Sequence, residues 1–172
     1  MKRKIVVFLL ISACFILQST VFKSLALANI SPNLLIVIVS SFGFMRGKKS
    51  GLLIGFFSGL LVDISYGEVI GFYSLMYMYI GYFNGFFKKI FYPEDVKLPM
   101  ALIAGSDFLY GILIYFFLFL FRKRYEFGYY LMHIIIPELV YTILVTLVLY
   151  RVILFINNKL EESEKRSASK FV

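Results

Sequence analysis

The chain has 172 residues, 60% of them hydrophobic, a formal net charge of +8 and a mean hydropathy of +0.85. A soluble domain of this size is roughly half apolar, so the excess excludes an ordinary soluble protein and indicates an integral membrane protein. The basic residues stand in short runs beside apolar segments and form no basic face on an amphipathic element. This distribution argues against binding to nucleic acid.

Six apolar segments approach the length of about 20 residues that a membrane-spanning helix needs. We expect helices at residues 5–22, 33–45, 51–65, 69–87, 98–121 and 129–156. The first apolar run exceeds the usual hydrophobic region of a signal peptide, about 7–15 residues, so we interpret it as a retained span. The predicted fold is an all-α integral membrane protein. It has one domain over residues 1–156, a bundle of six transmembrane helices with short loops, and a disordered cytoplasmic tail at 157–172.

Lys and Arg are divided unevenly between the two ends of this predicted bundle. With the N-terminus inside the cell, 14 of the 18 basic residues fall on cytoplasmic segments, and four, Lys23 and Arg122 to Arg124, fall on the other side. Because cytoplasmic loops carry the excess of Lys and Arg, both termini are predicted to be cytoplasmic. The Arg122 to Arg124 cluster runs against the rule. A five-span arrangement would place it inside but would discard a long apolar last segment.

A glycine pattern dominates the third predicted helix. Residues on one line recur every four positions: Gly47, Gly51, Gly55, Gly59, Asp63, Gly67 and Gly71. Such residues lie on nearly one face of a helix, drifting about 40° per step, and a face without side chains lets another helix approach closely. The fourth helix carries a matching line at Tyr73, Tyr77, Gly81 and Gly85. We predict a helix-packing or partner interface at Gly51, Gly55, Gly59, Asp63, Gly71, Gly81 and Gly85.

Three acids lie within apolar spans, namely Asp63, Asp107 and Glu138. A charge at membrane depth costs at least about 2.5 kcal/mol, and no Lys or Arg lies deep enough to pair with these acids. Hydroxyls, amides or water must therefore be their partners. We predict that Asp107, Glu138 and Asn84 are buried polar residues. Two interpretations stay open for the acids: hydrogen bonds between helices or solvation near the outer surface, or the lining of a polar cavity or partner contact.

Other polar residues have predicted structural roles. Ser31-Pro32-Asn33 is a capping sequence for the second helix, and Gln18 is placed to bond to a neighbouring helix. No nucleophile–base pair, metal-ligand spacing or phosphate-binding loop is visible, and the single Cys14 and single His133 stand apart. The sequence therefore predicts a non-enzymatic protein without catalytic residues, metal or cofactor.

Several of these motifs resemble the MreD family of rod shape-determining membrane proteins. They are Pro32-Asn33-Leu34-Leu35, the stretch from Phe42 to Gly51, the stretch from Gly55 to Asp63, and Gly67-Glu68-Val69-Ile70-Gly71-Phe72. Length, short loops and a basic N-terminus fit this family over nearly the whole chain. The N-terminal two-thirds carry most of the resemblance, and the last two spans match only in hydropathy.

The resemblance implies a scaffold in the bacterial cytoplasmic membrane that belongs to the cell-elongation machinery. Such a protein partners MreC, and through it the MreB filament, the RodA glycosyltransferase and a penicillin-binding transpeptidase, and it helps to position peptidoglycan synthesis and maintain rod shape. The span of MreC would dock against the small-residue faces. The resemblance also implies a fold similar to the substrate-binding subunits of energy-coupling-factor transporters, with Arg46 among the family-like positions and no catalytic roles.

The transporter resemblance leaves an alternative, a small-molecule binding subunit of the vitamin type. It needs an outward pocket with convergent polar groups, which Asp63, Glu68, Asp107 and Glu138 would line. Against this alternative, the first span lacks the alanine-x-x-x-alanine pattern with which such subunits dock their transport partner. A lipid- or ion-handling transporter is a third hypothesis, and it would need a continuous polar path that the sequence does not show.

Overall fold

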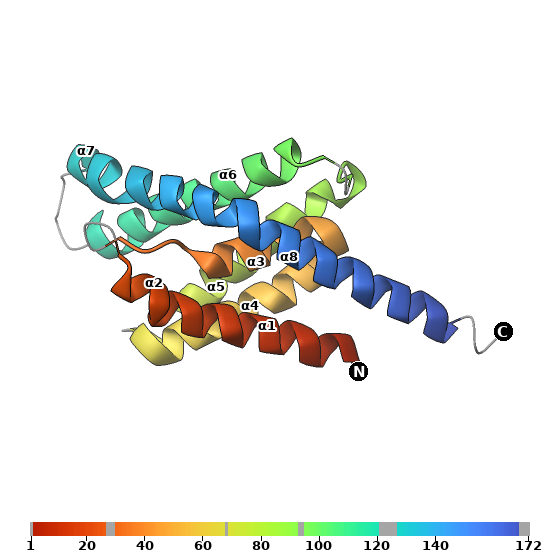
Figure 1. The fold of residues 1–172 in the computed structure, drawn as a ribbon. Coiled ribbons are helices and arrows are strands. Elements are labelled where there is room, and N and C mark those ends of the chain that lie inside the picture. Colours follow the sequence, from red (N-terminus) through yellow and green to blue (C-terminus); the bar gives the residue numbers. More distant parts are fainter. Residues whose placement is uncertain (1, 27–29, 68, 93–94, 121–126, 169–172) are drawn as a thin grey trace.

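The computed structural model describes residues 2–26, 30–67, 69–92, 95–120 and 127–168, and within these ranges it contains helices and no β-strand (Figure 1). The first helical segment consists of α1 (Lys2–Ser19) and the short α2 (Val21–Ser24). Three segments follow: α3 (Leu34–Arg46), α4 (Lys48–Tyr66), and α5 (Phe72–Asn84) with the 3-10 helix η1 (Gly85–Lys89). The fifth segment consists of α6 (Lys97–Ile114) and the π-helix η2 (Tyr115–Leu120). The sixth consists of α7 (Phe127–Tyr130), the π-helix η3 (Leu131–Ile135) and α8 (Ile136–Ala168). This order agrees with the six predicted segments.

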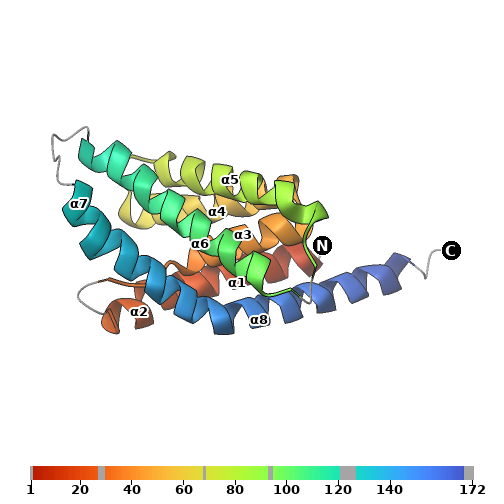
Figure 2. The same cartoon turned by 90° about the horizontal axis from the view of Figure 1, so that it is seen from above.

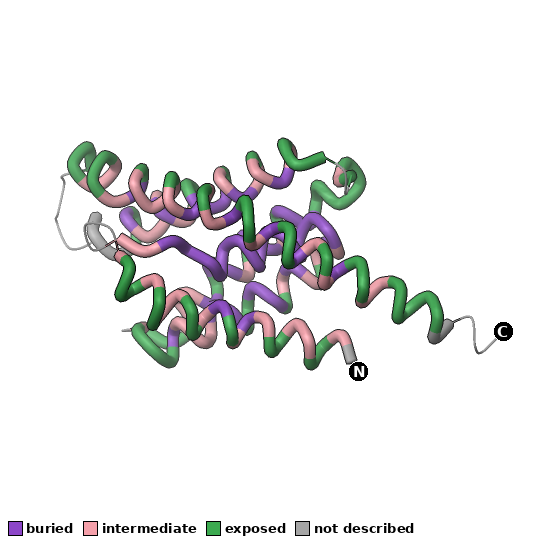
Figure 3. Tube along the Cα trace, viewed as in Figure 1, coloured by how far each residue is buried: buried purple, intermediate pink, exposed green. Residues whose placement is uncertain are grey.

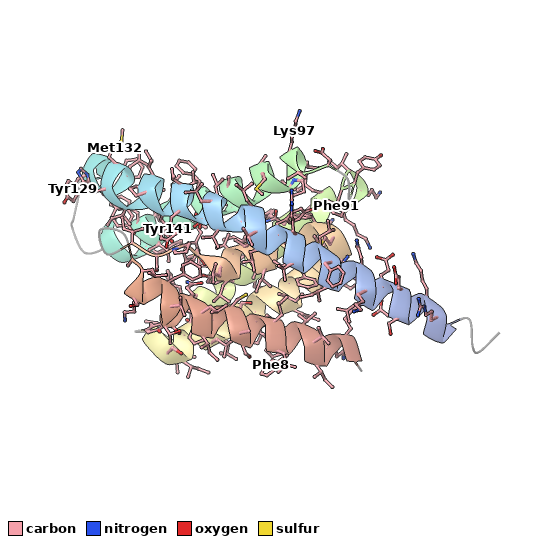
Figure 4. The ribbon with its side chains drawn as sticks, in the orientation of Figure 1. Phe8, Phe91, Lys97, Tyr129, Met132 and Tyr141 are labelled. Atoms are coloured by element: carbon pink, nitrogen blue, oxygen red, sulfur yellow. The ribbon has the colours of Figure 1, made fainter. Side chains whose placement is uncertain are left out.

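The helical segments run in alternate directions through the bundle (Figures 1 and 2). One end holds the N-terminus, the α3–α4 turn, η1 and the C-terminal part of α8, and we call it the basic end. Arg3, Arg46 and Lys48 belong to it, and Lys97 lies there at the start of α6 (Figure 4). The opposite end holds α2, the connection between α4 and α5, and α7, where Tyr129 lies (Figure 4).

Helix α3 is the centre of the bundle. Every residue from Leu34 to Met45 is buried, and the helix contacts α1, α4, α5, α6 and α8 (Figure 3). Its sequence is apolar on all sides, which is the pattern of a helix enclosed by others. With 13 residues it is about 20 Å long, shorter than the roughly 30 Å hydrocarbon core of a bilayer. The buried, non-helical residues Pro32 and Asn33 lead into it.

Four helical segments of the described chain are long and apolar enough to cross a membrane, judged by length and composition. They are Arg3–Ser24, Lys48–Tyr66, Lys97–Phe117 and Phe127–Arg166. The shorter α3 is apolar as well. Pro137, which has no N–H to donate, lies inside the continuous helical segment Phe127–Arg166, directly after the π-helix η3. A proline at an internal position removes a helix hydrogen bond to the preceding turn.

The C-terminal segment differs from its prediction. We expected disorder from residue 157, but α8 continues to Ala168, and residues 169–172 lie outside the described part. The charges that suggested disorder form contacts instead. Lys165 pairs with Glu161 one turn away at 3.3 Å, and Glu164 reaches two arginines on other helices. Neighbouring opposite charges at this spacing support a helix.

Candidate functional site

The glycine face of α4 packs directly against α5. A methyl group built on Gly51 would lie 2.6 Å from the carbonyl carbon of Gly81, and one on Gly55 would lie 2.6 Å from that of Tyr77. At Gly59 it would lie 2.6 Å from the backbone nitrogen of Ser74. Real side chains do not approach backbone this closely, so only glycine fits at these three positions.

The face of α5 that meets α4 also has glycine at its contact positions. A methyl group on Gly81 would meet the backbone of Gly51, and one on Gly85 would meet the backbone of Gly47 and Lys48. The fourth predicted helix therefore fills the groove of the third along its length. This finding corrects the expectation that a partner's span docks on these glycines, because an internal helix already occupies that face.

Gly47 and Gly71 have a different role from the one that the four-residue repeat suggested. Both lie outside α4 and adopt positive φ angles, 95° and 100°, which favour glycine. A methyl group on Gly71 would meet nothing within 4 Å, so this residue is not part of the packing interface. The helical part of the repeat is Gly51, Gly55, Gly59 and Asp63, and the flanking glycines make turns.

Asp63 completes the start of α5. Its carboxylate accepts hydrogen bonds from the backbone N–H groups of Tyr73 at 2.9 Å and Ser74 at 3.0 Å, and from the hydroxyl of Ser74. The first N–H groups of a helix have no partner within it, and the helix dipole favours a negative charge there. Asp63 is 2% exposed, and it therefore acts as a buried cap for the N-terminus of α5, the helix that follows its own in the sequence.

A second polar group surrounds the start of α3. The Oδ1 atom of Asn33 accepts from the backbone N–H of Ile36 at 3.2 Å and from the hydroxyl of Tyr77 at 3.0 Å, which confirms the predicted cap. The backbone N–H of Leu35 donates to Oε1 of Gln18 at 3.2 Å, as expected for a residue that bonds to a neighbouring helix. These bonds join α1, α3 and α5.

Helices α6 and α8 complete this polar junction. The backbone N–H of Asn33 donates to Oγ1 of Thr142 on α8 at 3.1 Å, and the carboxyl of Asp107 on α6 lies beside this threonine. Asp107 is 4% exposed, and among the described residues its Oδ1 atom has no hydrogen-bond partner. Glu138 is half-buried and lies one turn before Thr142 on α8.

Asn84 forms a separate polar contact nearer the basic end. Its Nδ2 atom donates to Oγ of Ser106 at 2.7 Å and to the carbonyl of Ile80 at 2.9 Å, and Oγ of Ser40 lies at 3.5 Å. These residues join α3, α5 and α6 in an apolar surrounding. For Asn84, and for Asp63, the structure supports hydrogen bonding between helices.

A small cavity of about 260 Å³ lies near the opposite end, beside the polar junction, and Gln18, Tyr66, Tyr77 and Tyr110 are on its wall. Ligand pockets are usually about 300–1,000 Å³. Of the acids expected to line an outward pocket, Asp63, Asp107 and Glu138 do not lie on this wall, and Glu68 lies outside the described residues. This cavity is therefore not the acidic pocket that a small-molecule binding subunit would need.

Ionic contacts tie the ends of three helices together at the basic end. Glu164 of α8 pairs with Arg3 of α1 at 3.1 Å and with Arg46 of α3 at 3.2 Å. Arg46 also donates from Nε to Oδ1 of Asn157 at 2.6 Å. Sequence reasoning missed Glu164 and Asn157, because their partners lie more than 100 positions away and no local pattern marks them.

No group of three or more His, Cys, Asp and Glu side chains that could hold a metal ion occurs in the described ranges. Compared with known families, the chain matches the rod shape-determining protein MreD over residues 1–159. No curated protein and no solved structure matches it. The expected similarity to energy-coupling-factor subunits therefore stays a prediction.

Proposed function

The chain belongs to the MreD family of rod shape-determining proteins, and on that basis we propose that it is a membrane scaffold of the bacterial cell-elongation machinery. The match over residues 1–159, nearly the whole chain, carries this proposal. Membership implies a membrane protein with a role in determining rod shape. The proposed mechanism is the formation of a complex with MreC that positions peptidoglycan synthesis, with MreB, RodA and a penicillin-binding transpeptidase as indirect partners.

The roles of the polar residues within the spans support the proposed scaffold function. Asp63 caps a helix, Asn84 joins three helices, and Asn33 joins the junction around α3. Each of these groups is engaged in maintaining the bundle, and we propose that the protein is not an enzyme. Because α5 covers the glycine face of α4, we propose that the span of MreC docks on another, outward-facing surface.

Depletion in a rod-shaped bacterium tests this function. Loss of the chain is expected to make the cells round, and a plasmid copy is expected to restore rods. A Gly55→Leu copy should fail to restore them, because it separates α4 from α5, whereas a Gly105→Leu copy should succeed, since a methyl group built on Gly105 meets nothing within 4 Å.

Affinity capture of the tagged chain is the second measurement. We expect MreC to co-purify with the unchanged chain and with the Gly105→Leu chain. Cells that stay rod-shaped after depletion, together with captures that contain no MreC, would contradict the proposed scaffold.

We propose a multi-pass arrangement with both termini in the cytoplasm, supported by the gathering of basic residues at one end of the bundle. Single cysteines test it, because the native Cys14 is buried. Lys49→Cys should react with a membrane-impermeant reagent only in opened cells, and Tyr66→Cys should react in intact cells. The reverse pattern would contradict this orientation.

A further inference from the structure

A groove between α1, α3 and α4 opens at the basic end of the bundle, and the cavity of about 260 Å³ lies toward the opposite end of the same two helices α1 and α4. It encloses about 440 Å³, within the range of ligand-binding pockets. Val7 and Ile11 of α1 and Leu53 and Phe57 of α4 line its walls. Phe8 at its edge projects outward from α1 (Figure 4). Apart from its mouth, the groove is apolar.

The mouth of the groove is basic. Arg3 and Lys4 from α1 and Arg46 from α3 lie on it, together with the hydroxyl residue Ser50. Glu164 pairs with both arginines. Three cations against this one anion leave two positive charges at the mouth, and the groove itself offers no anion to match them.

The dimensions match one leaflet of a membrane. Arg3 and Ile11 are eight residues apart on α1, which is about 12 Å along a helix. Half of a hydrocarbon core of about 30 Å is about 15 Å, so a groove whose mouth lies at the membrane surface reaches well into one leaflet. The charged mouth then lies at the depth of lipid headgroups.

We propose that this groove binds an anionic phospholipid, with the phosphate between Arg3, Lys4 and Ser50 and one acyl chain along the apolar walls. A lipid of this kind satisfies both halves of the site, because it joins a negative group to a long apolar chain. An apolar partner helix would cover the apolar walls of the groove but would leave the excess of basic side chains at its mouth without a negatively charged partner. The proposal concerns lipid binding and does not depend on the complex with MreC.

A tryptophan reporter tests the proposal in the full chain, since the natural chain contains no Trp. Leu53 lines the groove and is 55% exposed, so Leu53→Trp places an indole there with little disturbance. The variant is reconstituted into vesicles that contain brominated phosphatidylglycerol or brominated phosphatidylcholine, whose bromines quench indole fluorescence. The two quenching curves give the relative affinity of the groove for the anionic lipid.

Phe83→Trp on α5 is the matched control. Phe83 is 55% exposed and stacks on Phe86. The ammonium nitrogen of Lys48 lies 3.4 Å from the centroid of the Phe86 ring. This position therefore has a basic residue nearby but is not part of the groove. We expect phosphatidylglycerol to be favoured about fivefold or more at Leu53→Trp, in line with the effect of one basic residue near an anionic surface, and clearly less at Phe83→Trp.

Charge variants in the Leu53→Trp chain complete the test. Lys4→Gln should lower the preference for phosphatidylglycerol about fivefold, and Glu164→Gln should raise it by removing the competing anion. Lys49→Gln, the same charge change at an exposed residue outside the groove, should leave it unchanged. Equal preferences at the two reporters, no response to Lys4→Gln, or weaker quenching by both lipids at Leu53→Trp than at Phe83→Trp, as under a docked helix, would overturn the proposal.

Discussion

Asp63 shows how a single charged residue is accommodated in an apolar helix. Its carboxylate has three donors, all from the first turn of α5, and its exposed fraction is 2%. The apolar surrounding makes these bonds costly to lose, because water cannot replace a missing acceptor there. The acid is therefore needed for the start of the next helix.

Replacing Asp63 tests this role. Asp63→Ala should lower the free energy of unfolding by about 1–3 kcal/mol, since buried N–H groups lose their acceptor. Asp63→Asn keeps one amide oxygen as an acceptor and should cost less. The midpoint of thermal unfolding of the purified protein in detergent measures both changes. Equal losses for the two variants would contradict a capping role.

The bond between Tyr77 and Asn33 is a second residue-scale contact. A double-mutant cycle of Tyr77→Phe and Asn33→Ala isolates it from the other bonds of Asn33. The expected coupling is about 0.6 kcal/mol, the average measured for hydrogen bonds between membrane helices, and at most about 1.7 kcal/mol. Additive losses in thermal stability would show that the 3.0 Å contact contributes nothing.

At the scale of elements, the close packing of α4 against α5 is possible because the glycines between them have no side chains. Tyr77 and Ser74 lie with their backbone against Gly55 and Gly59, so the distance between the two helix axes is set by glycine. The same pair is tied at one end by Asp63. Packing and capping therefore fix both the spacing of these helices and the point where α5 begins.

A pair of alanine substitutions tests the packing. Gly55→Ala places a methyl group against the backbone of Tyr77 and Met78 and should cost about 1–3 kcal/mol or more of unfolding free energy. Gly105→Ala on α6 adds the same group in open space and should be neutral or stabilise the helix by about 0.5–1 kcal/mol. Thermal unfolding in detergent compares them. A Gly55→Ala protein as stable as Gly105→Ala would refute close packing.

Much of the element structure could be predicted because hydropathy and glycine spacing are local patterns. The six apolar segments and the meeting of Gly51 with Gly81 follow from them. Gly71 was misassigned because the four-residue repeat continues past the end of α4 into a turn, and spacing alone does not show where a helix stops. The extension of α8 was missed because a high charge content was taken as disorder.

The polar junction and the groove could be predicted only in part. Asn33 and Gln18 were identifiable as capping and bonding residues, but Thr142 and Glu164 find their partners through the topology of the whole bundle. The groove likewise needs the placement of α1 against α4, which no local pattern contains. Long-range contacts of this kind decide which polar residues meet.

On the scale of the whole molecule, the basic end is held together by ion pairs. Glu164 links the last helix to Arg3 and Arg46, and its side chain is 46% exposed. Pairs exposed to this degree contribute about 0–1 kcal/mol, so they add little to global stability. Their effect is local, since they hold the end of α8 against the bundle.

Limited proteolysis tests this local effect. Glu164→Ala should leave the thermal midpoint nearly unchanged but should speed tryptic cleavage at Lys159 and Lys165 several-fold, because the end of α8 is released. Glu161→Ala removes only the pair within α8 and is the matched control. If both variants are cleaved at the rate of the unchanged protein, the contacts of Glu164 do not restrain the helix.

The enclosed position of α3 has a consequence for biosynthesis. The backbone N–H of Asn33 receives its acceptor from Thr142, which the ribosome adds 109 residues later. Until then the nascent chain carries this N–H without the acceptor that it has in the finished bundle. The start of α3 therefore obtains its full set of hydrogen bonds only after the last helix has been synthesised, so we expect this part of the bundle to form late in biosynthesis.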